Sequence, residues 1–157
     1  MDILTIISIA VGSFAFSLVT YFRTIIHDRK KATLEAFNVL QDQVFDQINQ
    51  YSPKEIAEYM KHPTDKQYKI LSGYMARIEH FCVGVENNIY DKKTVYELAH
   101  GYLDGKVLWS RLSPIMEAKN NDFQKEDYFE NIHKTMKWMD KETIKRNKKM
   151  TRKSITI

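Results

Sequence analysis

The stretch ILTIISIAVGSFAFSLVTYF, residues 3–22, contains no charged side chain. A bilayer core about 30 Å thick is crossed by about 20 helical residues, because each residue adds 1.5 Å along the axis. A cleaved signal peptide would open with basic residues and close on a small-residue cleavage site. This stretch follows Asp2 instead and shows no such site. It therefore predicts a retained membrane-spanning helix.

The flanks of this stretch predict its orientation. Arg23, Arg29, Lys30 and Lys31 follow it, whereas only Asp2 and the start of the chain precede it. Basic residues favour the cytoplasmic side of a span. We expect a single-pass inner-membrane protein with its N-terminus outside and its C-terminal domain in the cytoplasm.

Charge is unevenly placed along the chain. The net charge of +4 divides into −1 at Asp2, +3 over residues 23–31, −4 over residues 32–140 and +6 over residues 141–153. Bases beside a membrane are attracted to an anionic inner leaflet. We expect leaflet contact from the basic residues on both sides of the domain: Arg23, Arg29, Lys30, Lys31, Lys145, Arg146, Lys148 and Lys149. Plain solvation of the tail is the alternative. Nucleic-acid binding is not expected, because no aromatic residues are interleaved with these bases.

Composition predicts an all-α protein. The chain has five Gly and three Pro, which favours long helices with few turns, and its single Cys82 cannot form an internal disulfide. The expected fold is one transmembrane helix continuing into a cytosolic bundle of about four helices. The expected divisions are an anchor with its basic collar at 1–26, a helical domain at 27–140 and a basic tail at 141–157.

Local patterns place the helices of this bundle. Residues 22–51 lack Gly and Pro, and an apolar stripe follows helical spacing there: Leu34, Phe37, Val44, Ile48 and Tyr51. Ser52 with Glu55, and Thr64 with Gln67, form the capping-box pattern that begins a helix. The second of these helices should run to Asn87-Asn88.

Two more helices are expected towards the C-terminus. One begins at a capping Asp91 and continues to Ser113-Pro114, with Gly101 and Gly105 on one side for close packing against a neighbour. Asn120-Asn121-Asp122 reads as a loop. The last helix should begin near Gln124, bury Tyr128, Phe129, Ile132, Met136 and Met139, and fray beyond Asp140.

Candidate chemistry is limited to two Glu-x-x-His pairs, Glu97 with His100 and Glu130 with His133. Such pairs ligate metals in di-iron bundles when two further helices each add a Glu. Here the pairs fall on the last two predicted helices, an order that those bundles do not use, so exposed helical residues are the default interpretation. No phosphate loop, Cys-x-x-Cys or nucleophile elbow occurs. We expect no enzyme activity and no cofactor.

Residues 77–91, RIEHFCVGVENNIYD, resemble the signature of a bacterial family known as a domain of unknown function, DUF4760. The matching positions are Glu79, Phe81, Val83-Gly84, Ile89-Tyr90 and Asp91, with similar landmarks at Trp109, Pro114-Ile115, Tyr128-Phe129-Glu130 and Trp138. The basic residues usual near position 117 are missing. The resemblance implies an N-terminal membrane helix with a small helical domain, and no activity. Val83-Gly84 is expected to let another helix approach closely.

These observations favour a membrane-tethered module that acts through protein interaction or regulation. Two alternatives stay open. One is a self-associating membrane effector, for example in phage defence, whose spans pack through Ser8 and Gly12 or Ser13 and Ser17. The other is a metal-binding bundle built on the Glu-x-x-His pairs. The partners expected are the bilayer, a protein and a second copy.

Overall fold

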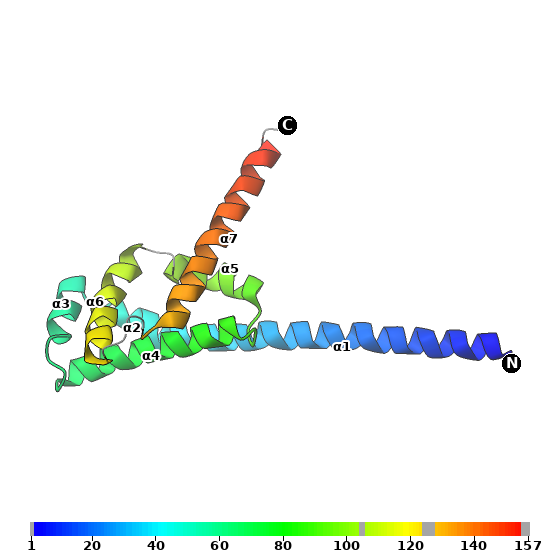
Figure 1. Cartoon of the computed structure of the whole chain (residues 1–157), viewed down its shortest axis with the longest axis horizontal. Helices are drawn as coiled ribbons and strands as arrows, with labels where there is room; N and C mark the ends of the chain where they lie inside the picture. The colour runs from blue at the N-terminus through cyan, green and yellow to red at the C-terminus, as the bar shows by residue number, and fades with distance from the viewer. Residues whose placement is uncertain (1, 104–105, 124–127, 155–157) are drawn as a thin grey trace.

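The computed structural model describes residues 2–103, 106–123 and 128–154, without the side chains of 3–10, 106–108, 122–123 and 152–154. Every regular element in these ranges is a helix, and no strand occurs in them. Helix α1 (Ile3–Leu40) projects from the domain as a long rod with the N-terminus at its far end (Figure 1). The all-α prediction is confirmed.

The predicted continuation of the first helix into the domain is also confirmed. α1 passes without a break into a π-helical turn, η1 (Gln41–Phe45), and then into the short α2 (Asp46–Ile48). A π turn holds one more residue than an α turn, so the neighbours Val44 and Phe45 are both buried here. The predicted stripe is correct at Phe37 and wrong at Leu34, which is exposed; Thr33 is buried in its place.

No stretch of the described side chains is both long and apolar enough to cross a membrane. The predicted span begins inside α1, but the side chains of its residues 3–10 are outside the described part. The side chains of α1 are described from Val11 onward, and Arg23 is the first charged residue after it. The uncharged segment between them is shorter than the roughly 20 residues that a bilayer requires.

Short-range signals at the next two helices behave largely as predicted. Helix α3 (Pro53–Tyr59) begins with the capping box. The Ser52 backbone N–H donates to the Glu55 carboxylate at 2.7 Å, and the Glu55 backbone N–H donates to the Ser52 hydroxyl at 3.3 Å. The second predicted capping box is wrong: Asp65, not Thr64, caps helix α4 (Lys66–Glu86) by accepting from the Gln67 N–H.

The end of α4 follows the sequence prediction. Asn88 has a φ of 55°, and the Ile89 N–H donates to the Gly84 carbonyl at 2.9 Å, as in a Schellman motif. The Asn87-Asn88 stop is therefore confirmed, because asparagine tolerates the left-handed conformation that this motif needs.

The C-terminal helices differ from the prediction. Residues expected in one helix form α5 (Lys92–Leu103) and α6 (Lys106–Phe123), separated in sequence by Asp104-Gly105, a dipeptide that favours turns. α6 continues through Pro114 and the expected 120–122 loop. Burial of its Leu112, Ile115 and Met116 outweighs the helix-breaking tendency of proline. The bundle therefore has more helices than the four expected.

The last helix also extends further than predicted. Helix α7 runs from Glu130 to Ser154, so it continues well past the expected fraying point at Asp140. Phe129, Ile132 and Met139 are buried as predicted, and Met136 is half-buried. Tyr128 was expected inward and is exposed. The predicted start at Gln124 is outside the described residues.

Packing arranges these helices around α4. α4 lies along α1 and also packs against α6 and α7, while α5 covers α1 and α3 covers α6 (Figure 1). Aromatic rings fill the centre: Phe45 stacks on Tyr102 with ring centroids 5.1 Å apart, and Phe37 contacts both. A core built from several long helices holds the base of α1 in place.

A row of polar contacts sets the register between α4 and α7. The Glu79 carboxylate accepts from the backbone N–H groups of Asn131 and Ile132, at 3.2 and 3.0 Å, and from the Asn131 side chain. Two turns along, Glu86 accepts from the Thr135 hydroxyl. A carboxylate at a helix N-terminus satisfies free N–H groups and interacts favourably with the helix dipole.

Asp91 joins the start of α5 to α1. Its backbone N–H donates to the Thr33 hydroxyl at 2.9 Å, and its carboxylate accepts from the backbone and the hydroxyl of Thr94. Burial alone would raise the pKa of Asp91, but the two hydrogen bonds from Thr94 outweigh it and hold the pKa below its ordinary value. The predicted cap at Asp91 is confirmed.

Replacing Asp91 by alanine should lower the free energy of unfolding by about 1 kcal/mol at pH 7, because the cap of α5 is lost. A depressed pKa contributes stability above the unfolded value of about 4, and this contribution is lost as pH falls through the folded value. The difference between wild type and Asp91→Ala should therefore shrink below about pH 4 in urea unfolding curves. Asp140→Ala, at an exposed position inside α7, is the control. Equal effects of the two substitutions would contradict the assignment.

Candidate functional site

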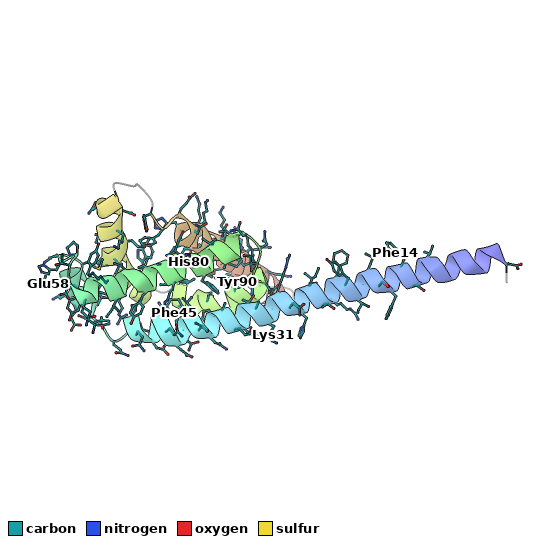
Figure 2. The ribbon with its side chains drawn as sticks, turned by 90° about the horizontal axis from the view of Figure 1, so that it is seen from below. Phe14, Lys31, Phe45, Glu58, His80 and Tyr90 are labelled. Carbon is teal, nitrogen blue, oxygen red and sulfur yellow. The ribbon has the colours of Figure 1, made fainter. Side chains whose placement is uncertain are left out.

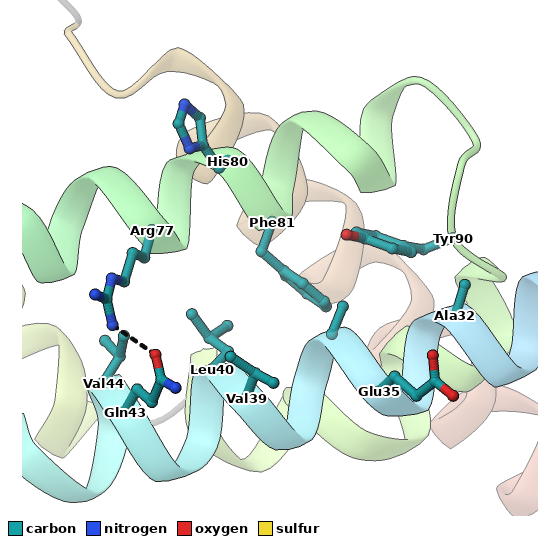
Figure 3. Close-up of a pocket in the computed structure, with 11 residues that line it drawn as sticks. Ala32, Glu35, Val39, Leu40, Gln43, Val44, Arg77, His80, Phe81 and Tyr90 are labelled. Atoms are coloured by element: carbon teal, nitrogen blue, oxygen red, sulfur yellow. Dashed lines mark hydrogen bonds between the residues drawn. The ribbon is translucent and has the colours of Figure 1, made fainter.

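A groove of about 590 Å³ lies between α1 and α4 (Figure 3). We call it the α1–α4 groove. Its lining comes from α1, η1, α4 and the residue that follows the α4 stop: Ala32, Glu35, Ala36, Val39, Leu40, Gln43, Val44, Arg77, His80, Phe81 and Tyr90. Its lining combines apolar and charged groups.

The floor of the groove is apolar. Leu40, Val44 and Phe81 belong to the buried core, whereas Val39 keeps 54% of its surface exposed. Ala32 and Ala36 lie one turn apart on α1 and leave the helix surface low between them. An apolar side chain entering here would contact core residues directly.

Two side-chain arrangements close the ends of the groove (Figure 3). At one end the Arg77 guanidinium donates to the Gln43 side chain at 2.8 Å. At the other end the Tyr90 ring stacks on Phe81 with centroids 5.1 Å apart. Tyr90 also lies against Gly84, where an added Cβ would overlap the ring. Val83-Gly84 therefore admits a tyrosine ring, and the predicted close approach of another helix there is wrong.

Polar side chains lie along both edges of the groove. Glu35 points outward from α1, where it is exposed and 3.9 Å from Lys31. His80 points outward from α4 on the other rim, and Arg77 comes from the same helix. The groove is thus an apolar channel with a carboxylate of α1 near its Tyr90 end and a guanidinium of α4 at its other end.

A π turn underlies the Arg77 end. Gln41–Phe45 supplies Gln43, and a second hollow beyond the Arg77–Gln43 contact is lined by Asp42, Gln47, Lys69, Ile70, Gly73 and Tyr74. π turns occur often at functional sites, because they displace one residue from the helical repeat. Here the displacement points Gln43 towards Arg77 while Val44 stays in the core.

The groove combines polar and apolar groups, as binding surfaces do. Its polar groups are an amide, a carboxylate, a guanidinium, an imidazole and a phenol, and its other lining residues are apolar. Apolar concave sites with a few polar groups at their edges bind ligands and helices.

The structure does not bring the predicted metal-ligand candidates together. Glu97 lies near Lys93, while His100 stacks on Tyr96 and contacts its carbonyl oxygen at 2.9 Å. Glu130 pairs with Lys134. His133 packs against Trp109, with ring centroids 6.0 Å apart. Among the described residues, no group of three or more metal-ligating side chains gathers.

Other residues singled out from the sequence have structural roles. Glu79 caps α7, so it points away from His80 on the groove rim. Cys82 is buried, and burial raises the pKa of its thiol to about 12. Gly101 faces open space, which contradicts its predicted role in close packing, and Gly105 is outside the described residues.

The predicted membrane-surface bases lie at two places. Arg23, Arg29, Lys30 and Lys31 are exposed on α1 where it leaves the domain, and Lys145, Lys148 and Lys149 are exposed on the far part of α7. Arg146 differs from them, because its guanidinium lies over the Tyr96 ring at 3.9 Å and donates to Glu142.

Sequence reasoning missed the groove as a site. The Arg77–Gln43 contact joins residues 34 positions apart, and no local pattern reports it. The sequence offered one signal, the small residues Ala32 and Ala36 one turn apart within a predicted helix.

The chain belongs to the family described as Domain of unknown function (DUF4760), whose model matches residues 7–138. The match begins within the apolar part of α1 and ends in α7, so it includes both helices of the groove. No curated protein and no solved structure matches the chain.

Two glycines of α4 allow a matched test of the groove. Gly84→Ala should lower the free energy of unfolding by about 1–3 kcal/mol, because its Cβ overlaps Tyr90. Gly73→Ala should raise it by about 0.5–1 kcal/mol, because no atom lies within 4 Å of the new Cβ and alanine favours the helix. Urea unfolding of the two variants measures this. A stabilising Gly84→Ala would show that Tyr90 does not close the groove as described.

Proposed function

We propose that this member of the DUF4760 family is a single-pass membrane protein whose helical domain works on the cytoplasmic side by binding a protein, without catalysis. The observation that carries the proposal is the projecting part of α1. The apolar side chains described there, between Val11 and Phe22, stand outside the domain core (Figure 2).

The exposure of this segment is not confined to one face. Phe14 and Phe16 are 67% and 75% exposed and point in nearly opposite directions, since each residue turns the helix by about 100°. A helix that is apolar all round requires an apolar environment. Residues 3–10 add a further uncharged stretch in the sequence, which brings the total to the length that a bilayer accepts.

The basic collar supports the orientation. Arg23, Arg29, Lys30 and Lys31 occupy the part of α1 between the apolar segment and the domain, and all four are exposed. Bases at this position favour retention of the domain on the cytoplasmic side.

The far part of α7 supports a second contact with the membrane. It extends beyond the core and leans towards the side on which α1 projects (Figure 1). Lys145, Lys148 and Lys149 are exposed there, together with the apolar Ile144 and Met150. A helix that combines bases with exposed apolar residues suits the surface of an anionic leaflet, where each base contributes roughly 1 kcal/mol.

The anchor is tested by a charge placed in α1. Leu18→Arg should cost about 3 kcal/mol of insertion free energy, so carbonate should extract a larger fraction of this variant from membranes than of wild type. Leu34→Arg makes the same change on an exposed residue inside the domain and should stay with the membrane fraction. Extraction of wild type itself by carbonate would refute the anchor.

The leaflet contact is tested by hydrogen exchange of residues 141–151 in the full chain reconstituted into vesicles. Exchange should be slower with anionic lipid than with zwitterionic lipid, and high salt should remove the difference by screening. Lys148→Glu combined with Lys149→Glu should abolish the protection, whereas Lys54→Glu with Lys66→Glu, distant on α3 and α4, should keep it. Equal exchange in both lipids would exclude the contact.

A further inference from the structure

A basic hollow lies where α7 passes α5 (Figure 1). Its volume is about 340 Å³, and we call it the α5–α7 hollow. The residues that line it are Lys93 of α5 and Glu142, Lys145, Arg146 and Lys149 of α7. Four bases and one acid give the lining an excess of three positive charges. The hollow shares no lining residue with the α1–α4 groove.

Arg146 has a fixed orientation in this hollow. Its Nε donates to the Glu142 carboxylate at 3.0 Å, and its guanidinium lies over the Tyr96 ring at 3.9 Å. A planar guanidinium gains from both contacts at once, because it stacks on aromatic rings and donates in fixed directions. A lysine ammonium on its flexible stem would not keep this orientation.

The tyrosine that supports Arg146 is itself fixed by the fold. Tyr96 belongs to the core, and its hydroxyl shares a hydrogen bond of 2.8 Å with the Thr143 hydroxyl of α7. The His100 ring stacks on the Tyr96 ring with centroids 4.9 Å apart. α5 therefore positions a guanidinium that belongs to α7, so the arrangement exists only where the two helices meet.

The terminal nitrogens of Arg146 remain for a ligand. Within the described part of the chain, the hydrogen bond of Arg146 is the one from Nε to Glu142. The edge formed by Nη1 and Nη2 can bind two oxygens of one phosphate. Lys93, Lys145 and Lys149 are exposed and line the same hollow, so they add positive charge around that edge.

We propose that the α5–α7 hollow binds a phosphate group, with Arg146 as its bidentate donor and the three lysines of the lining as further cations. A phosphate monoester carries a charge of about −1.5 to −2 at neutral pH, which matches the excess of positive charge better than one carboxylate does. The leaflet contact proposed above requires only diffuse attraction between exposed bases and lipid. This inference goes beyond it, because it assigns one stoichiometric site.

Two sources offer the same phosphate chemistry: a headgroup of the inner leaflet and a soluble phosphate ester. The start of α5 lies beside the collar of α1, since the Asp91 N–H donates to Thr33 and both Lys30 and Lys93 interact with the Asp91 carboxylate. One wall of the hollow is therefore close to the collar. The headgroup source rests on the proposed membrane anchor, whereas the soluble source does not.

Titration calorimetry of inorganic pyrophosphate into the purified full chain, in nanodiscs of zwitterionic lipid, tests the site. Wild type should bind one pyrophosphate per chain. Arg146→Lys keeps the charge but loses the bidentate edge, so it should weaken binding about tenfold. Lys148→Gln removes a charge of α7 outside the lining and should weaken binding less than about twofold. The reverse order, or no binding by wild type, would overturn the proposal.

A variant on the other helix tests the site without altering α7. Lys93→Gln should weaken pyrophosphate binding about threefold, because it removes one charge of the lining. Lys54→Gln makes the same change at an exposed position of α3 and should leave the affinity as in wild type. Equal affinities of Lys93→Gln and Lys54→Gln would contradict a site shared by α5 and α7.

Two further nanodisc compositions distinguish the sources of phosphate. Phosphatidylglycerol in one and oleic acid in the other give the same negative surface charge, but only phosphatidylglycerol carries a phosphate. A headgroup ligand predicts weaker pyrophosphate binding with phosphatidylglycerol than with oleic acid, and a soluble ligand predicts equal binding. A chain that does not enter nanodiscs disproves the anchor and is titrated in buffer, so failure of the anchor and failure of the site are distinct.

Discussion

The structure depends on the continuity of α1. One helix carries an exposed apolar segment, a basic collar and part of the domain core, from Ile3 to Leu40. Because every backbone hydrogen bond of a helix constrains its neighbours, the orientation of the projecting part is transmitted to the core without a hinge. The domain is therefore mounted rigidly on the segment that we propose as its anchor, and both faces of the groove keep a fixed relation to that segment.

Polar contacts then fix how the other helices sit on α1 and α4. Glu79 caps α7, Asp91 caps α5 while its backbone binds Thr33, and Arg111 of α6 donates to the Tyr51 carbonyl at 2.8 Å. Such contacts are specific in register, because a shift by one residue would leave a partly buried polar group without its partner. Buried apolar surface supplies most of the stability, and these polar contacts select one arrangement of the packed helices.

The groove is what this arrangement leaves unfilled. Ala32 and Ala36 are too small to cover the space between α1 and α4, and the Arg77–Gln43 contact and Tyr90 limit its length. A larger side chain at either alanine would occupy the groove itself. The presence of small residues beside exposed Val39 is what gives this helix pair a surface suited to a further helix.

Sequence patterns were most reliable where one local force dominates. The Ser52–Glu55 capping box, the Asp91 cap and the Asn87-Asn88 stop involve neighbours in the chain, and each was predicted correctly. They failed where packing competes with propensity. Pro114 and Asn120 favour a break, yet α6 continues through both because Leu112 and Ile115 are buried. In η1, the π turn buries both Val44 and Phe45, so the 3.6-residue repeat used for the prediction does not hold there.

The sequence by itself determined the all-α class, the caps of α3 and α5 and the uneven distribution of charge, because composition and near neighbours carry that information. Only the tertiary structure decided that the Glu-x-x-His residues lie apart, which face of α1 stays exposed and where a groove opens. Those outcomes depend on contacts between residues far apart in the chain, such as Gln43 with Arg77 and Glu79 with Ile132. No local pattern encodes such contacts, since the free energy that selects them is shared among the whole set of packed helices.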